Sequence, residues 1–387
     1  MAKRTIAYIS ETSLTDCDIP LLHELSKDAT VDYYLIITNN STQGTLVDIT
    51  IKKKGGIYRG TEYPELKNLE KWIDLNHIYI VNIPVNHYWE WTNFKVTWRW
   101  MQLLRKRNYD IIHLTWPLRY CFFALYLLRK KMVITMHDPI PHSSQMSLTN
   151  RFHRYCSIRL TPDFILLNKI QKPLFIKKYG VNESRVHLSR LSVYTHLRES
   201  TATSTLCTMP YILYVGSIHS HKGIEYFCEA MKTITNDIPD IHVAIAGRGN
   251  FYFDISEYEK MPNYMFINRY ITNEELVSLI SNSIAVVCPY IDATQSGVIM
   301  SAFALNKPVI ATNVGALPEM MEDGRHGFLI PPKDSKALEQ AVRKIIQPNI
   351  ARQMSENIAH DYSAGKYSWH SIASEILETY ETIINKR

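Results

Sequence analysis

Short apolar segments alternate with amphipathic segments of helix length along the first half of the chain. The six apolar segments typical of buried strands span residues 5–9, 33–37, 78–83, 111–114, 132–136 and 164–167. The helices predicted between them lie near residues 18–27, 92–108, 117–130 and 169–179. Strands that are almost wholly apolar and alternate with helices indicate a parallel sheet with both faces covered.

The same alternation begins again at residue 211. The predicted strands of this second series span residues 211–215, 243–246, 264–267, 284–288, 309–311 and 328–330. Its predicted helices span residues 223–236, 272–281, 295–305 and 334–346. Two such series predict an α/β protein with two doubly wound, Rossmann-like domains.

Polar segments indicate where the domains end. The least periodic part of the chain, residues 198–210, is the best candidate for a linker. A second polar segment lies near residues 360–367, and an amphipathic helix is predicted over residues 368–386. We therefore expect a first domain over residues 1–200, a second over 208–365, and a C-terminal helix over 366–387 that packs back on the first domain.

Composition adds the broad class of protein. A chain of 387 residues is long enough for two hydrophobic cores. Its 46% hydrophobic and 21% charged residues are typical of a folded soluble protein. The longest apolar run, residues 120–128, is far shorter than the ~20 residues of a membrane-spanning helix. The six scattered cysteines and an N-terminus without a signal-peptide pattern favour a reducing cytoplasm.

Positive charge is concentrated in the first half of the chain. Residues 1–200 contain 28 Lys and Arg against 17 Asp and Glu, whereas residues 201–387 contain 15 against 20. Much of the excess follows Trp98, among aromatic residues: Arg99, Arg105, Lys106, Arg107, Arg119, Arg129, Lys130, Lys131, Arg151, Arg154 and Arg159. Such a face suits an anionic membrane, a nucleic acid or an anionic substrate. A solvated basic surface explains the pattern equally well.

Ligands of open α/β sheets bind outside the carboxyl ends of the strands. We therefore expect the two domains to face each other across a cleft lined by strand-end loops. These loops follow Val215, Ala246, Cys288 and Ala311 in the second domain, and Ile9, Leu114 and Met136 in the first.

The first of these loops in the second domain reads Gly-Ser-Ile-His-Ser-His-Lys-Gly over residues 216–223. Gly216 frees the backbone after the strand, and Lys222 lies at the first turn of the next helix. A cation and unpaired helix N–H groups can hold a phosphate together, although a solvated lysine is the plainer alternative. His219 and His221 are too few to indicate a metal site, which needs further ligands.

Residues 294–297 open another helix with Thr294, Gln295, Ser296 and Gly297. The first N–H groups of a helix have no partner within the helix, and they suit a bound diphosphate. A serine or threonine at the N-cap would satisfy the same donors without any ligand, so the sequence leaves both readings open.

Two other loops contribute glycines and charged residues. Gly247 and Arg248 follow one strand, where a pair of glycines permits close backbone approach to a ligand. Gly315 and Glu319 follow another strand, and Glu319 could instead complement a helix N-terminus.

The strand at 132–136 of the first domain leads into His137 and Asp138, and His142 follows after two prolines. A lone histidine is more often structural, but a His-Asp pair at the carboxyl end of a strand favours a functional role. Glu11 follows the first strand, at the same predicted edge.

Six segments together, in their order and spacing, resemble the retaining glycosyltransferases of family 4, which have the two-domain GT-B fold. The segments are DIIHLTWP (110–117), VITMHDPIPH (133–142), KYGVNESRVHLSR (178–190), LYVGSIHSHKGIEYFCEA (213–230), AIAGRGN (244–250) and CPYIDATQSGVIMSAFALNKPVIATNVGALPEMMEDGRHGFLIPPKD (288–334). The last segment is the most specific, because six or more fixed features fall in register.

The resemblance implies a UDP- or GDP-sugar donor bound by the second domain, an acceptor bound by the first, and no required metal or other cofactor. It implies catalytic roles for Lys222, on the donor diphosphate, and for His137, beside the transferring sugar. The further donor-side residues are Gly216, Ser217, Gly247, Arg248, Thr294, Gln295, Ser296, Gly297, Gly315 and Glu319. On the acceptor side it implies Glu11, Asp138 and His142.

The chain departs from the family pattern at three places. Ser217 stands where many members have an arginine that pairs with the lysine on the diphosphate. Two glutamates that many members carry eight positions apart are replaced by Thr294 and Ala302, or by Ala293 and Ser301 in a second possible alignment. The TQSG turn is typical of a subgroup. Residues 10–15 replace the glycine-rich loop after the first strand.

We therefore expect a hexosyltransferase-type enzyme of bacterial surface-polysaccharide biosynthesis, with a glycan or lipid-linked acceptor. The basic first domain suits a peripheral position on the inner face of the cell membrane, and no nucleic-acid partner is expected. The missing charges leave open a non-catalytic GT-B protein that binds a sugar nucleotide or a glycan for another transferase. A GT-B epimerase is a weaker alternative, because its reaction needs carboxylates around the donor sugar.

Overall fold

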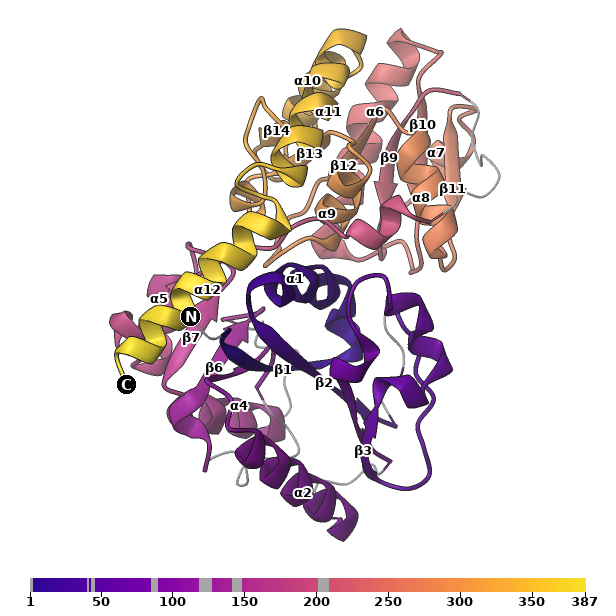
Figure 1. Cartoon of the computed structure of the whole chain (residues 1–387). Helices are drawn as coiled ribbons and strands as arrows, with labels where there is room; N and C mark the ends of the chain where they lie inside the picture. The colour runs from indigo at the N-terminus through magenta and orange to yellow at the C-terminus, as the bar shows by residue number, and fades with distance from the viewer. Residues whose placement is uncertain are drawn as a thin grey trace. The chain divides into compact units, whose positions relative to one another are not determined.

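A computed structural model describes residues 3–39, 42, 46–84, 90–117, 127–140, 148–200 and 209–387. The chain forms two compact units (Figure 1). The first unit comprises Met1–Arg190 and Trp369–Arg387, and the second comprises Leu191–Ser368.

Both boundaries of the second unit differ from those expected. It begins at residue 191 rather than 208, because Val193 and Leu197 are buried in its hydrophobic core. It ends at residue 368 rather than 365, because Tyr367 packs in the same core. Residues 201–208 of the expected linker lie outside the described residues.

The first unit is built on an eight-stranded sheet in the order β3-β4-β2-β1-β5-β6-β7-β8. The strands are β1 (Thr5–Glu11), β2 (Thr30–Thr38), β3 (Gly56–Arg59), β4 (Ile78–Ile83), β5 (Ile111–Leu114), β6 (Met132–Met136), β7 (Asp163–Leu166) and β8 (Val186–Leu188). All pairings are parallel except that of β3 with β4. The order of the parallel strands reverses direction between β1 and β5, which is where ligands bind in such sheets.

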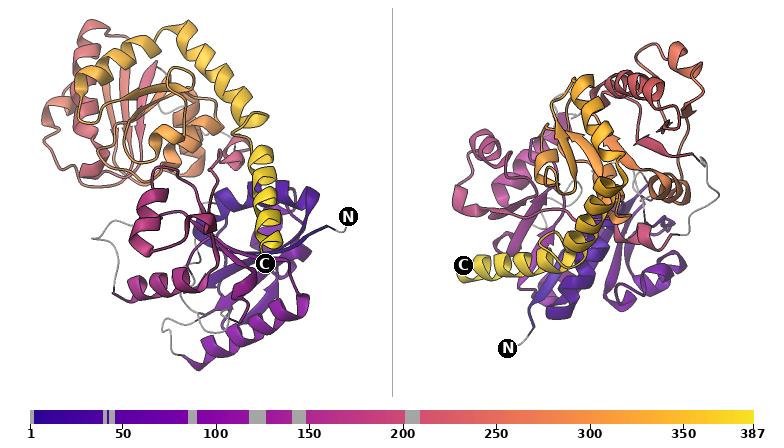
Figure 2. Two further views of the ribbon diagram at one scale, coloured as in Figure 1. Left: turned by 90° about the vertical axis from the view of Figure 1, so that its left-hand side faces the viewer. Right: turned by 90° about the horizontal axis from the view of Figure 1, so that it is seen from above.

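Among its described residues, the first unit contains the helices α1 (Thr15–Asp28), α2 (Trp91–Arg107), α4 (Leu148–Leu160), α5 (Lys172–Tyr179) and α12 (Trp369–Asn385). The C-terminal helix α12 packs against α1 (Figure 2). Ion pairs fix it there, from Arg4 to Glu381 at 2.6 Å and from Arg190 to Glu375 at 2.7 Å.

The second unit contains a six-stranded, all-parallel sheet in the order β11-β10-β9-β12-β13-β14. Its strands are β9 (Tyr211–Val215), β10 (His242–Ala246), β11 (Tyr264–Ile267), β12 (Ala285–Cys288), β13 (Val309–Thr312) and β14 (Gly327–Ile330). Its helices are α6 (Ile224–Asp237), α7 (Ser256–Glu259), α8 (Asn273–Asn282), α9 (Gly297–Ala304), α10 (Ser335–Ile345) and α11 (Pro348–Ser363). This is the strand order of a Rossmann fold, and it reverses between β9 and β12.

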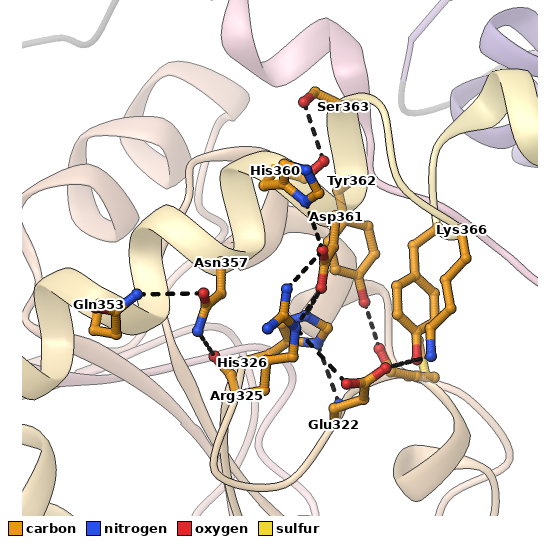
Figure 3. A network of polar contacts seen from close by, with 12 residues as sticks. Glu322, Arg325, His326, Gln353, Asn357, His360, Asp361, Tyr362, Ser363 and Lys366 are labelled. Carbon is orange, nitrogen blue, oxygen red and sulfur yellow. Dashed lines mark hydrogen bonds and ion pairs between the residues drawn. The ribbon is translucent and has the colours of Figure 1, made fainter.

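A network of hydrogen bonds and ion pairs surrounds the C-terminal end of α11 (Figure 3). Asp361 accepts hydrogen bonds from Arg325 at 2.7 and 2.9 Å and lies 2.8 Å from Nε2 of the buried His326. Glu322 pairs with both Arg325 and Lys366. The polar segment expected near residues 360–367 is helical as far as Ser363. Beyond Ser363, the ion pair of Lys366 with Glu322 holds this segment in place.

The predicted fold class is confirmed, and all twelve predicted strands are present. The pattern missed β3, which contains no fully buried residue, and the three-residue β8. It also missed α4 and the polar helix α11. Most of the helix expected over 117–130 lies outside the described residues. Within the described ranges, none of the helices combines the length and the apolar character that crossing a lipid bilayer requires.

Candidate functional site

The loops after β9 and β12 meet where the strand order of the second unit reverses. The backbone N–H of Ile291 donates to the carbonyl of His221 at 2.8 Å, which ties the two loops together. Gly223 has φ +65°, and a Cβ on this residue would lie 2.1 Å from the carbonyl oxygen of Pro289. Only glycine therefore permits the close approach that places Lys222 beside the β12 loop.

Lys222 lies above an aromatic ring rather than beside a carboxylate. Its Nζ is 3.7 Å from the centre of the Tyr290 ring, which is almost completely buried. Desolvation lowers the pKa of Lys222 from its ordinary value. No carboxylate pairs with this ammonium group among the residues that the structure describes. A partly desolvated cation without a fixed counter-ion is suited to bind an incoming anion.

The helix start at 294–297 has the capping arrangement that was one of the two alternatives left open by the sequence. Ser296 is the N-cap of α9, and its Oγ accepts from the N–H of Ile299 at 3.4 Å. This side chain is buried and also lies 3.3 Å from the hydroxyl of Tyr290. Ser296 therefore caps the helix, and its contact with a donor stays a prediction. Thr294 and Gln295 are half-buried, and Gly297 is exposed.

The loop after β13 lies against this helix start. Gly315 has φ +52°, and a Cβ there would be 1.5 Å from the carbonyl oxygen of Ala293. Thr312 donates to the carbonyl of Tyr290 at 2.6 Å, which joins the end of β13 to the loop after β12. Glu319 lies half-buried in the short 3₁₀ turn Leu317–Glu319.

The loop after β10 completes this edge of the second unit. Gly216 donates its N–H to the carbonyl of Ala246 at 3.0 Å, so Gly216 and Gly247 lie next to each other at the ends of β9 and β10. Ser217 and Arg248 are exposed. The structure thus gathers the expected donor-side residues at the carboxyl edge of one sheet.

His219 and His221 stack their rings with centroids 5.6 Å apart. In the part of the chain that the structure describes, no group of three His, Cys, Asp or Glu side chains could hold a metal ion. The structure therefore offers this pair no third ligand among those residues.

In the first unit, His137 directly follows β6. Desolvation lowers the pKa of His137 to about 4, against the opposing effect of Asp138. Its imidazole is therefore neutral at pH 7, able to donate one hydrogen bond and accept another. Glu11 ends β1 and is half-buried. His142 lies outside the described residues.

Arg154 of α4 supports the loop that carries His137. Its guanidinium donates to the carbonyls of Asp138 and Pro139, the latter at 2.9 Å, and to the hydroxyl of Tyr179 at 2.9 Å. The side chain is buried, so Arg154 does not belong to the exposed basic face expected from the sequence. Arg107 is exposed but forms an ion pair with the buried Asp32.

A second histidine lies beneath this edge. His113 of β5 is buried, and its ring nitrogens contact the hydroxyls of Tyr380 on α12 and Thr135 on β6. Burial, with a smaller effect of His137, lowers the pKa of His113 to about 3. Sequence reasoning missed His113 because nothing in a short buried strand indicates which distant hydroxyls face it.

Asp18 is also buried near the end of β1, and burial raises its pKa to about 7. It accepts hydrogen bonds from Tyr8 at 2.9 Å and from Ser10. Ser10 in turn accepts from Thr115, which follows β5, at 2.9 Å. These contacts join the strand ends of the first unit and lie beneath its surface.

Family models match both units. Residues 209–348 match the model described as "Glycosyl transferases group 1", and residues 58–190 match "Glycosyltransferase Family 4". The alpha-D-kanosaminyltransferase of Streptomyces kanamyceticus is 29% identical over 178 residues, 45% of this chain and 46% of that protein. The phosphatidyl-myo-inositol mannosyltransferase of Mycobacterium leprae is 22% identical over 174 residues, 44% of this chain and 46% of the relative. The chain thus spans less than half the length of these curated relatives.

Solved structures resemble the whole chain. Sucrose-phosphate synthase from Thermosynechococcus elongatus superposes with a TM-score of 0.65 at 18% identity, over 100% of both chains. Anabaena Alr3699/HepE in complex with UDP gives a TM-score of 0.64 at 15% identity, over 98% of this chain and 100% of the other. At these identities the likeness establishes the fold, which is GT-B. The first unit therefore contains a domain of glycosyltransferase family 4 and the second a domain of the group 1 glycosyltransferases, on the GT-B fold.

Proposed function

We propose that this protein is a retaining glycosyltransferase that moves a sugar from a UDP- or GDP-sugar to a glycan or lipid-linked acceptor. The observation that carries the proposal is the position of Lys222, above Tyr290 and tied to the loop that opens α9. In this proposal the cation and the first N–H groups of α9 share the donor diphosphate at the switch point of the Rossmann-like sheet. The names of the relatives, transferases of an aminosugar and of mannose, support a nucleotide-sugar donor.

In this proposal the second unit stabilises the departing diphosphate. The bond between the anomeric carbon and the diphosphate breaks, and the bond to the acceptor oxygen forms on the same face of the sugar. The acceptor proton passes to an oxygen of the departing diphosphate. Lys222 and the N–H groups at the start of α9 balance the developing negative charge, so the step needs neither a protein nucleophile nor a metal. The chain has the TQSG turn of the proposed subgroup. Its Thr294 and Gln295 orient the sugar with neutral hydrogen bonds in place of the glutamates.

The first unit supplies the acceptor side. A neutral His137 can hydrogen-bond a hydroxyl of the transferring sugar without repelling a cationic transition state. Arg154 holds the His137 loop through the carbonyls of Asp138 and Pro139. Glu11 ends β1, and Asp138 follows β6. We therefore assign acceptor recognition to the first unit. We propose that the acceptor belongs to surface-polysaccharide synthesis at the inner face of a bacterial membrane.

The test is donor binding and turnover by the purified chain. We expect UDP or GDP and one of their sugars to raise the melting temperature, and that donor to be hydrolysed or transferred. Lys222→Ala should lower turnover at least about 100-fold, because a preorganised charge on the leaving group is lost. Lys260→Ala, which changes an exposed lysine of the same unit, is the matched control. Turnover of Lys222→Ala near wild type, or binding without any turnover, would contradict the proposal.

A further inference from the structure

Helix α2 presents aromatic side chains on the side that faces away from the core. Trp91, Phe94 and Trp98 are 67%, 55% and 43% exposed, and we call these three residues the aromatic ridge. The opposite side of the helix packs on the sheet through Val96 and Trp100, which are buried. Single exposed aromatic residues are ordinary, but three that adjoin one another form a patch that calls for a partner.

The rings of the aromatic ridge are in mutual contact. Trp91 and Phe94 stack with centroids 5.2 Å apart, and Phe94 and Trp98 follow at 6.2 Å. The spacing of three and four residues places them along one stripe of the helix. Because neighbouring rings cover one another's faces, less ring face is left on which the base of a single-stranded nucleic acid could stack. The stripe offers a continuous apolar edge instead.

Basic side chains flank the aromatic ridge. Lys95, Arg99, Arg105 and Lys106 are exposed, and the Nζ of Lys95 lies 5.7 Å from the ring centre of Trp91. The helix from Trp91 to Arg107 contains no acidic residue. An apolar stripe of tryptophan and phenylalanine between basic residues is the pattern of a helix that lies in the plane of a lipid surface. The partner that matches both features is an anionic bilayer.

We propose that α2 is a membrane-docking helix, with the aromatic ridge inserted among the lipid headgroups and the flanking cations on anionic lipid. The helix is about 25 Å long, at 1.5 Å per residue, so it provides an extended rather than a point contact. This inference concerns the surface alone. It rests on neither the donor site nor the transfer reaction, and it assigns the membrane contact to named residues of α2 rather than to the basic first half in general.

The experiment uses the full chain and vesicles, without a sugar donor. We expect the protein to sediment with vesicles of phosphatidylglycerol and phosphatidylcholine at low salt, and much less with phosphatidylcholine alone or at high salt. The triple variant Trp91→Gln, Phe94→Gln, Trp98→Gln should bind at least about tenfold more weakly. Removing the cations with Lys95→Gln, Arg99→Gln and Lys106→Gln should weaken binding about fivefold per charge.

Two controls separate docking from folding and from catalysis. Tyr270→Gln changes an exposed aromatic residue of the second unit and should bind vesicles like the wild type. The ridge variant should keep the wild-type melting temperature and its response to nucleotide, since its three side chains are exposed. Absence of wild-type binding to anionic vesicles, equal binding by the ridge variant, or tighter binding to single-stranded nucleic acid than to vesicles would overturn the proposal.

Discussion

The buried ring of Tyr290 forms part of the surroundings of the Lys222 ammonium group. Its ring supports the Nζ of Lys222, and its hydroxyl contacts Ser296, the N-cap of α9. One side chain thus connects the cation to the start of the helix that is proposed to share the diphosphate. Sequence reasoning identified Lys222 and Ser296 but not Tyr290, because a tyrosine after a strand carries no signal of what lies above its ring.

We predict that the ring of Tyr290, and not its hydroxyl, matters for binding. Tyr290→Leu should weaken the affinity for nucleotide diphosphate about 2- to 30-fold, because a cation–π contact of about 0.5–2 kcal/mol is lost. Tyr290→Phe keeps the ring and should bind close to the wild type. Isothermal titration with UDP and GDP measures both, beside the melting temperature of each variant. A folded Tyr290→Leu protein with wild-type affinity would remove Tyr290 from the site, whereas a wild type that binds neither nucleotide would remove the donor site itself.

At the scale of elements, the loops at the carboxyl edge of the second unit are locked by close backbone contacts. Gly315 lets the β13 loop reach the turn before α9, and Gly223 does the same for the β9 and β12 loops. The geometry of the candidate site therefore depends on residues that have no side chain to contribute. This dependence also explains why Gly223 and Gly315 belong to the segments that carry the family resemblance.

Substitution of Gly315 tests this dependence, and the chain contains a matched control. Gly315 and Gly324 both have positive φ, at +52° and +73°, but an added Cβ meets the carbonyl of Ala293 only at Gly315. Gly324→Ala should cost about 1–2 kcal/mol of unfolding free energy for the left-handed backbone alone. Gly315→Ala should cost more, by about 2 kcal/mol or above, and should also weaken nucleotide binding. Urea unfolding and titration with UDP measure both effects. Equal costs, or unchanged affinity in Gly315→Ala, would contradict the account.

The difference between fully buried and partly exposed elements explains which parts of the fold could be predicted from the sequence. Strands such as β9 and β12 are buried on both faces and read as apolar runs, so their positions and the loops after them follow from the pattern. The edge strand β3 and the helix α11 carry weaker patterns and were missed. The contacts of His113 with Tyr380, and of Arg154 with Asp138, join residues that are distant in sequence or in separate elements. No local pattern specifies such contacts.

At the scale of the molecule, the chain crosses between the units twice, at residues 190/191 and 368/369. Both crossings are fixed on the second unit at one place, since Ser192 donates to the carbonyl of Tyr367 at 2.6 Å. The network around Asp361 lies just before the second crossing (Figure 3). We infer that this network holds the segment from which α12 departs, and so contributes to the stability of the second unit.

The network predicts a specific dependence of stability on pH. Hydrogen bonds from Arg325 lower the pKa of Asp361 well below its usual value, with smaller contributions from His360 and His326. A carboxyl group with a depressed pKa stabilises the folded state above its unfolded pKa of about 3.9, and this contribution is lost as the pH falls toward the folded pKa. Asp361→Asn should therefore reduce the unfolding free energy by about 2 kcal/mol at pH 7 and by progressively less below about pH 4.

Urea unfolding of the wild type and of Asp361→Asn, at several pH values between about 7 and 2.5, measures this difference. Asp240→Asn, at an exposed position of the same unit, is the control and should change stability little at any pH. The two curves of wild type and Asp361→Asn should converge on acidification, because protonation of Asp361 removes in the wild type what the amide removes at every pH. Curves that stay parallel down to the lowest pH would show that the loss comes from packing and not from the charge of Asp361.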